Sequence, residues 1–183
     1  MLVLVVGPSG AGKDTLLAAA SAQLAGDHRI RFVRRVITRP PGIVGEAYDS
    51  LTEQAFEAQR EGGAFALAWR AHGLQYGIPA DIGLDIAQGR TVVANVSRAV
   101  IAEAAGRYPL RVIEISAPAD TLARRLAARG REDAVDLARR LARSIELPLP
   151  VERDTIMNDG TIEAGARRLV DLLTRAASDA QPA

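Results

Sequence analysis

The N-terminal stretch constrains the fold more than any other part of the chain. Residues 2–6 form an apolar, β-branched-rich run, typical of a parallel strand buried on both faces, and residues 12–24 favour a helix. Between them lies the pattern G-x-x-x-x-G-K, made by Gly7, Pro8, Ser9, Gly10, Ala11, Gly12 and Lys13. Such glycines let backbone N–H groups curl around phosphate oxygens, and the lysine reaches the β and γ phosphates. The stretch therefore predicts an ATP-binding loop.

The next position departs from the usual pattern. A Ser or Thr hydroxyl normally ligates Mg²⁺ there, whereas this chain has Asp14 and then Thr15, which we count among the ATP-binding residues. Asp14 suits Mg²⁺ as a hard oxygen ligand, and it equally suits the first turn of a helix, so both roles are open. A second metal carboxylate often ends a neighbouring strand, where this chain has Asn95. We hypothesise that Asp14 supplies the charge that Asn95 lacks.

Apolar runs alternate with helical stretches along most of the chain. Further strands are expected at residues 31–37, 91–95, 110–116 and 151–157. Helices are expected to begin at Ser50, which has capping-box spacing, at Pro79, at Ser97, at Pro118 and at Thr161, and another covers residues 133–147. This alternation predicts an α/β fold in which a five-stranded parallel sheet is flanked by helices.

One stretch breaks that rhythm. Residues 38–89 contain turns, a short helix and two short pieces at residues 65–70 and 74–77, which indicates a small inserted lobe. We predict one domain over residues 1–177, with a core at 1–37 and 90–177 and a lobe at about 38–89. An arginine-rich lid is expected at about 125–143 and a frayed tail at 178–183.

The charge balance excludes some functions. There are 23 Lys plus Arg against 22 Asp plus Glu, so the net charge of +1 argues against nucleic-acid binding and polybasic membrane attachment. No apolar run approaches the ~20 residues of a membrane span. The absence of Cys removes disulfides, thiolate metal sites and a Cys nucleophile, and the two distant His make no zinc site. A cytoplasmic location is expected.

All basic residues except Lys13 are arginines, and three groups of them stand where a second phosphate would bind. Arginine binds phosphate oxygens in pairs through its planar fork. Arg39 precedes two prolines at the start of the lobe, and Arg98 follows the strand that ends at Asn95. The third group surrounds Gly130 and contains Arg125, Arg129, Arg131, Arg139, Arg140 and Arg143. The i,i+4 spacing of Arg125 with Arg129 and of Arg139 with Arg143 suits a flap that closes over ATP, although a solvated helix face is the alternative.

With these motifs, the chain resembles the guanylate-kinase-like branch of the P-loop nucleoside monophosphate kinases over about residues 1–175. The glycine-rich loop is followed in the expected order by Thr38-Arg39, Gly45-Glu46, Trp69, Tyr76-Gly77, Arg125 to Gly130, Arg140-Leu141 and Asn158-Asp159. The resemblance implies a P-loop kinase with a five-stranded core, a substrate-binding lobe and an arginine lid. A non-catalytic interaction domain of this branch is an alternative.

A narrower resemblance is to the ribose 1,5-bisphosphate phosphokinases (PhnN) of phosphonate utilisation. It is carried by Gly7 to Asp14, residues 36–40, residues 69–74, residues 76–79 and residues 95–98. Guanylate kinases have a guanine-binding carboxylate before the Trp, where this chain has Ala68, and an Asp where it has Asn95. The resemblance implies that ribose 1,5-bisphosphate and ATP are converted into 5-phosphoribosyl 1-diphosphate (PRPP) and ADP. A guanylate kinase or another small-metabolite kinase is the alternative.

The resemblance also implies roles for individual residues. Lys13, Arg39, Arg129 and Arg140 would be catalytic. Arg125 and Asn158 would join the loop in binding ATP, although an Asn-Asp-Gly turn explains Asn158 equally well. Arg39, Tyr76, Asn95, Arg98 and Arg143 would bind the substrate, while His72 is as well explained by packing. The implied cofactors are ATP and Mg²⁺, and the implied partner is a sugar phosphate, in a monomer or homodimer with no nucleic acid or membrane.

Overall fold

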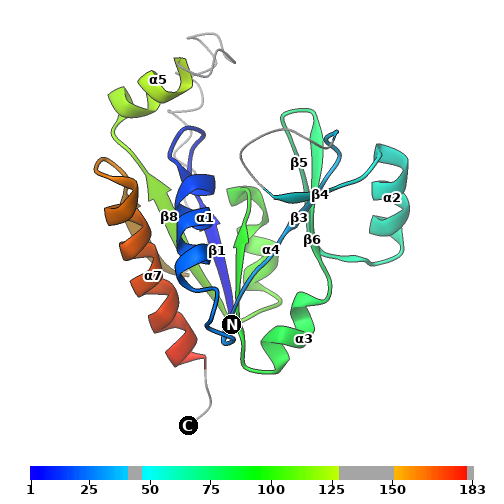
Figure 1. Cartoon of the computed structure of the whole chain (residues 1–183). Helices are drawn as coiled ribbons and strands as arrows, with labels where there is room; N and C mark the ends of the chain where they lie inside the picture. The colour runs from blue at the N-terminus through cyan, green and yellow to red at the C-terminus, as the bar shows by residue number, and fades with distance from the viewer. Residues whose placement is uncertain (41–46, 128–150, 181–183) are drawn as a thin grey trace.

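The core of the molecule is a sheet of five parallel strands, seen in a computed structural model that describes residues 1–40, 47–127 and 151–180 (Figure 1). Its spatial order is β2 (Ile30–Phe32), β7 (Thr91–Asn95), β1 (Leu2–Val6), β8 (Leu110–Ser116) and β9 (Glu152–Met157). The central strand β1 pairs with β7 on one side and β8 on the other. The carboxyl ends of these strands meet at one end of the sheet, where open parallel sheets bind ligands. The predicted five-stranded parallel sheet is confirmed.

Helices cover both faces of this sheet because alternate residues of its central strand face opposite ways. Val3 and Val5 share a buried cluster with apolar residues of α1 (Lys13–Gln23) and α7 (Ile162–Asp179), which lie side by side in Figure 1. Leu2, Leu4 and Val6 belong to a second cluster on the other face. That cluster includes residues of α3 (Ile82–Ala87), the 3₁₀ turn η1 (Arg98–Val100) and α4 (Ile101–Ala105). Helix α5 (Ala119–Ala127) follows β8.

The predicted lobe has a sheet of its own (Figure 1). Four strands lie in the order β4 (Tyr48–Ser50), β3 (Arg35–Ile37), β6 (Leu74–Pro79) and β5 (Phe65–Ala71). Helix α2 (Glu53–Glu61) packs against this sheet through Phe56, which is 1% exposed and stacks on Phe65 with ring centroids 4.6 Å apart. The two short pieces that the sequence indicated at residues 65–70 and 74–77 are β5 and β6, the strands of a hairpin.

The single strand predicted at residues 31–37 is wrong. The chain leaves the large sheet after Phe32 and enters the lobe sheet at Arg35. The chain divides in this way because β2 pairs with β7 in the large sheet, whereas β3 pairs with β4 and β6 in the lobe sheet. The lobe sheet therefore begins before the predicted boundary at residue 38 and ends with β6 at Pro79.

Several predicted helix ends also shift. Thr52 rather than Ser50 caps α2, because its side chain accepts a hydrogen bond from the Ala55 N–H, while Ser50 lies in β4. Pro79 ends β6 instead of opening a helix, since its strand still pairs with Phe65 and α3 begins two turn residues later. Helix α7 continues past the predicted boundary at 177 to Asp179.

Other predicted ends agree with the structure. The Ser97 side chain caps η1, and the Thr161 side chain caps α7. Helix α5 begins directly after Pro118, whose carbonyl accepts the Leu122 N–H at 2.9 Å. The predicted helix at residues 133–147, most of the predicted lid and Gly45-Glu46 lie outside the described residues. No helix in the described part of the chain has both the length and the apolar character that a membrane span requires.

Candidate active site

The glycine-rich loop connects β1 to α1 at the carboxyl end of the sheet, as predicted (Figure 1). Two of its glycines leave no room for a side chain. A Cβ on Gly7 would lie 1.9 Å from the Ile115 carbonyl oxygen, and one on Gly12 would lie 2.4 Å from the Asn158 amide nitrogen. Gly12 also has a φ of 88°, a left-handed conformation that favours glycine. The loop can therefore pack against β8 and the segment after β9 while keeping its curled backbone.

Lys13 is the first residue of α1 and lies over this loop. Its Nζ donates hydrogen bonds to the carbonyl oxygens of Gly7 at 2.7 Å and Pro8 at 3.1 Å. The ammonium is therefore held at the mouth of the curl, next to the positive end of the helix. This is the position at which a phosphate-binding lysine is required.

Asp14 and Asn95 meet, as the sequence hypothesis requires. Asn95 ends β7, next to β1, and its Nδ2 donates to Asp14 Oδ1 at 2.7 Å. The N-cap of α1 is Gly12, and Asp14 lies in the first turn of the helix, where a carboxylate also interacts favourably with the helix dipole. Asn95 is 6% exposed, and within the described residues its Oδ1 is buried without a hydrogen-bond partner. The pair thus presents oxygen atoms beside the phosphate loop.

A cavity of about 690 Å³ runs from the loop to the lobe. Its core wall is made by the loop, Asp14, the end of β7 and the start of η1, and its lobe wall by Arg35 and the β5–β6 hairpin. Its lining residues are Gly7, Pro8, Ser9, Lys13, Asp14, Arg35, Trp69, Arg70, Ala71, His72, Tyr76, Asn95, Val96, Ser97, Arg98 and Ala99. Basic side chains outnumber the one carboxylate in this lining, so the cavity suits an anionic ligand.

Arg98 lies where the sequence placed it, at the carboxyl end of a core strand. It lines the cavity, and its guanidinium donates to the carboxylate of Glu114 on β8. Glu114 also contacts Arg153 of β9 at 3.4 Å. Because two arginines share this carboxylate, the cluster keeps a net positive charge on the core wall of the cavity.

Arg125 and Asn158 support the loop from behind. The Asn158 Nδ2 donates to the Ala11 carbonyl at 2.7 Å, and its backbone N–H donates to Ser116 at 2.7 Å. Arg125 donates to the carbonyls of Gly10 at 3.4 Å and Asn158 at 3.1 Å. Asn158 is 6% exposed, so the structure gives it a supporting position beside the predicted ATP site and outside the cavity lining.

Tyr76 and Arg39 were both predicted to bind the substrate, and the structure separates them. Tyr76 lines the cavity, whereas Arg39 follows β3 outside the lining and places its guanidinium 5.6 Å from the Tyr48 ring. The Tyr48 hydroxyl donates to the Pro40 carbonyl at 2.6 Å and the Ser50 hydroxyl to the Arg39 carbonyl at 2.5 Å. The predicted Arg129, Arg140 and Arg143 lie outside the described residues.

No site role was predicted for Arg35, Arg70 or Ser97, which line the cavity, although Arg70 and Ser97 lie within the motifs of the resemblance. His72, weighed as packing or contact, also lines the cavity, at the tip of the β5–β6 hairpin with a φ of 53°. A left-handed, non-glycine residue at a hairpin tip is uncommon. Successive side chains of a strand point to opposite faces of its sheet. If the break between β2 and β3 had been known, this alternation along β3 could have predicted that Arg35 faces the cavity.

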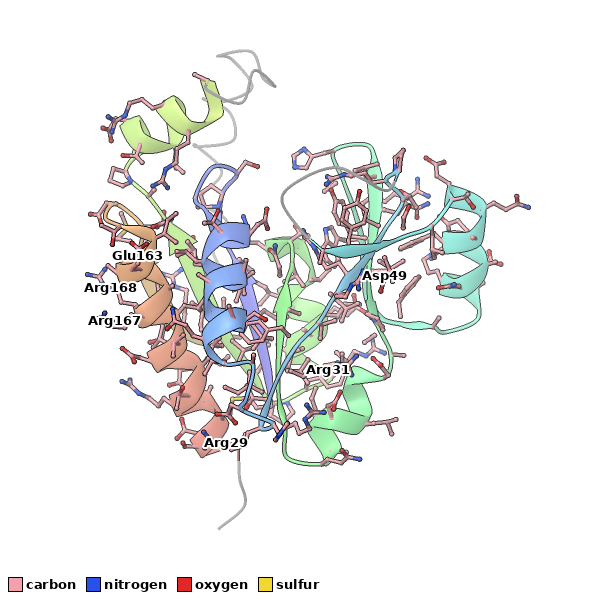
Figure 2. The ribbon with its side chains drawn as sticks, viewed as in Figure 1. Arg29, Arg31, Asp49, Glu163, Arg167 and Arg168 are labelled. Carbon is pink, nitrogen blue, oxygen red and sulfur yellow. The ribbon has the colours of Figure 1, made fainter. Side chains whose placement is uncertain are left out.

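Several arginines outside the cavity belong to ion pairs. Arg29 and Arg31 lie at the opposite end of the sheet from the loop (Figure 2) and pair with Asp27 at 2.7 Å and Asp81 at 2.9 Å. The hydrogen bond from Arg29 lowers the pKa of the Asp27 carboxyl below its ordinary value. The described residues hold no group of three or more His, Cys, Asp or Glu side chains able to hold a metal.

Comparisons with known sequences identify close relatives. No family model matches the chain. The chain is 52% identical over 171 residues to the ribose 1,5-bisphosphate phosphokinase PhnN of Methylobacterium radiotolerans, covering 92% of this chain and 94% of that protein. It is 42% identical over 183 residues to the protein of the same name in Agrobacterium fabrum, covering 99% and 100%.

A longer relative contains a similar sequence as one part. The bifunctional ribose 1,5-bisphosphokinase-thymidine phosphorylase of Cupriavidus necator is 47% identical over 184 residues. The match covers 98% of this chain but only 30% of that protein. The likeness therefore concerns a minor portion of the bifunctional protein.

Solved structures agree on the fold. A guanylate kinase from Anaplasma phagocytophilum superposes with a TM-score of 0.69 at 18% identity, covering 96% of this chain and 85% of that one. A sugar kinase from a Janibacter species superposes with a TM-score of 0.55 at 18% identity, covering 99% and 98%. These likenesses confirm the predicted P-loop kinase fold. The near full-length identities of 42% and 52% show that the chain belongs to the ribose 1,5-bisphosphate phosphokinase (PhnN) family.

Proposed function

We propose that the chain is an ATP-dependent kinase that converts ribose 1,5-bisphosphate into PRPP and ADP. The observation that carries the proposal is a single cavity that joins the phosphate-binding loop and Lys13 to a basic lobe wall, in a chain of this family. A kinase whose acceptor is itself phosphorylated requires positive charge on both sides of the reacting groups. The alternative of a non-catalytic interaction domain offers no reason for this arrangement.

The reaction requires positioning more than proton removal. A non-bridging oxygen of the 1-phosphate forms a bond to the γ-phosphorus of ATP while the bond from that phosphorus to the β–γ bridging oxygen breaks, and ADP leaves. The acceptor oxygen is already partly anionic near neutral pH, so no general base has to deprotonate it. Charge in the transition state spreads over the transferred phosphoryl group, where Lys13 and the loop N–H groups stabilise it.

We assign the substrate-binding roles according to which residues line the cavity. We assign Arg98 and Asn95 on the core wall and Tyr76 on the lobe wall to the acceptor, and Asn95 also donates a hydrogen bond to Asp14. Arg39 would bind the acceptor from the edge of the lobe, Arg143 would also bind the acceptor, and Arg129 and Arg140 would be catalytic. These four arginine roles rest on the family resemblance.

The residues present fit a Mg²⁺ ion. Asp14 offers a carboxylate in the cavity wall, and the buried Asn95 Oδ1 is a further oxygen beside it. Hard oxygen ligands suit Mg²⁺, which keeps the remaining positions for water and phosphate. Asp14 would hold the ion, with Asn95 fixing its carboxylate through the 2.7 Å hydrogen bond. A bound Mg²⁺ would supply positive charge to the β and γ phosphates.

The decisive experiment is a comparison of acceptors. The purified protein is incubated with MgATP and either ribose 1,5-bisphosphate or GMP, and ADP release is followed with a coupled assay. We expect turnover with the ribose bisphosphate and little with GMP, since Ala68 stands where guanylate kinases carry a guanine-binding carboxylate. Strong turnover on GMP alone would instead favour a guanylate kinase, and calorimetry without MgATP binding would favour an interaction domain.

We also propose a cytoplasmic enzyme with small-molecule partners only, acting as a monomer or homodimer. The support is chemical, because ATP and a sugar bisphosphate are metabolites of that compartment. Nucleic-acid binding lacks support from the net charge of +1.

A further inference from the structure

The lobe wall of the cavity carries a guanidinium that lies over one aromatic ring, and that ring stacks on a second one. Arg35 opens β3, and its guanidinium carbon lies 5.4 Å from the centroid of the Tyr76 ring. Tyr76 stacks in turn on Trp69, with centroids 5.3 Å apart and 7° between the ring planes. All three residues line the cavity. They form what we term the cation–aromatic ladder.

Strand register explains this arrangement. Ile37 pairs with Tyr76 across β3 and β6, and Tyr76 pairs with Trp69 across β6 and β5. Because alternate residues of a strand share a face, Arg35 lies on the same face of the lobe sheet as these three residues. The opposite face carries Gly77, whose missing side chain leaves room for the Phe65 ring. The ladder is thus fixed by the sheet and does not depend on a mobile loop.

The chemistry of the ladder favours a phosphate. A cation–π interaction holds a guanidinium over a ring, and the planar fork of guanidinium N–H donors matches the paired oxygens of a phosphate. Arg35 is half-buried. Arg70 of β5 has a side chain that is 75% exposed and pairs with Glu57 at 2.7 Å. Hydrogen bonds from Arg60 and, next, from Arg70 lower the pKa of Glu57. Arg35 is therefore the more enclosed of these two cations on the lobe wall.

We propose that Arg35, held by Tyr76 and Trp69, binds the non-reacting 5-phosphate of the acceptor and makes the enzyme select a sugar bisphosphate. The inference rests on the proposed function. The 1-phosphate must lie beside the γ-phosphate of ATP, hence near Lys13 on the core wall of the cavity. The phosphate on the far side of the sugar then extends toward the lobe wall, where Arg35 stands. A cationic wall favours this dianion over an uncharged base.

The test compares two acceptors in wild type and Arg35→Met. Ribose 1,5-bisphosphate carries the 5-phosphate and ribose 1-phosphate lacks it, while both offer the same reacting group. We expect Arg35→Met to lower kcat/KM for the bisphosphate by about 10- to 100-fold, the loss of a charged hydrogen-bonded contact. The kcat/KM for ribose 1-phosphate and the KM for ATP should stay unchanged. Equal losses on both acceptors would overturn the proposal.

Two further variants sharpen the comparison. Arg34→Met removes the adjacent arginine, whose side chain is 60% exposed and pairs with Asp49 at 2.8 Å on the lobe (Figure 2), and it should behave as wild type on both acceptors. Arg35→Lys keeps the charge but loses the fork, so it should lose only part of the preference for the bisphosphate. If Arg35→Met does not fold, an Arg35→Lys enzyme with the full wild-type preference would refute the role. A wild type without turnover of the bisphosphate would refute the proposed function itself.

Discussion

Replacing Asn95 with Asp tests the contact between β7 and the phosphate loop. In the wild type, the Asn95 amide donates to Asp14 Oδ1 at 2.7 Å in a partly buried site. The Asn95→Asp variant loses a hydrogen bond to a charged group, which costs about 1.5–3 kcal/mol of stability. It also places a second carboxylate next to that of Asp14. Two like charges at about 4 Å repel by about 4 kcal/mol at an effective dielectric constant of ~20, and side-chain relaxation reduces this. We expect a total loss of about 2–5 kcal/mol in the free energy of unfolding.

Thermal unfolding measures this loss. For a chain of this size, about 2–5 kcal/mol corresponds to a Tm lower by about 4–20 °C. Asn95→Ala is the matched control, because it removes the amide without adding charge and should lose about 1–3 kcal/mol. If Asp14 is the metal position, millimolar Mg²⁺ should raise the Tm of Asn95→Asp more than that of either the wild type or Asn95→Ala, with ionic strength held constant.

Two outcomes would refute this reasoning separately. If Asn95→Asp were no less stable than Asn95→Ala without Mg²⁺, the two carboxylates would not meet, and the contact would be wrong. If the added charge destabilised the protein but Mg²⁺ did not restore it, the contact would stand and the metal assignment would fail. Activity measurements alone would not separate these two cases.

The other predictions concern the loop and the lobe edge. Lys13→Ala should lower kcat by about 10²- to 10³-fold in the ADP-release assay. Lys13→Arg should lower kcat by a similar factor, because the rigid guanidinium fork does not fit the contacts that Lys13 Nζ makes, and an active Lys13→Arg enzyme would contradict this. Gly12→Ala should weaken ATP binding in calorimetry and lower the Tm, because the added Cβ would lie 2.4 Å from the amide nitrogen of Asn158. A Gly12→Ala protein that binds ATP with wild-type affinity would refute this prediction. Arg39→Ala should raise the KM for the acceptor more than that for ATP, and an effect on ATP alone would exclude the assigned role.

Local sequence was sufficient for the phosphate loop and the central strands. The loop glycines and Lys13 carry their chemistry within one short segment, and β1 is buried on both faces, so its apolar run is continuous. The meeting of Asp14 with Asn95 could also be expected, because parallel neighbours end at the same side of a sheet.

Features set by partners far along the chain could not be read in the same way. The break between β2 and β3 depends on which strands accept them, since residues 31–37 have one continuous strand-like composition. Arg35 escaped notice for the same reason, because its face is defined only by pairing with β6. Asn158 resembled a turn residue locally, and its supporting role depends on the Ala11 carbonyl, 147 positions away.

The central claim is that the acceptor is the 1-phosphate of ribose 1,5-bisphosphate, and the identity of the product tests it most directly. Phosphorus NMR of the purified protein with MgATP and ribose 1,5-bisphosphate should show a diphosphate on C1 with the 5-phosphate unchanged, formed in equal amount to ADP. A signal for GDP from GMP with no change in ribose 1,5-bisphosphate, or a new phosphate ester on a ribose hydroxyl, would contradict the account.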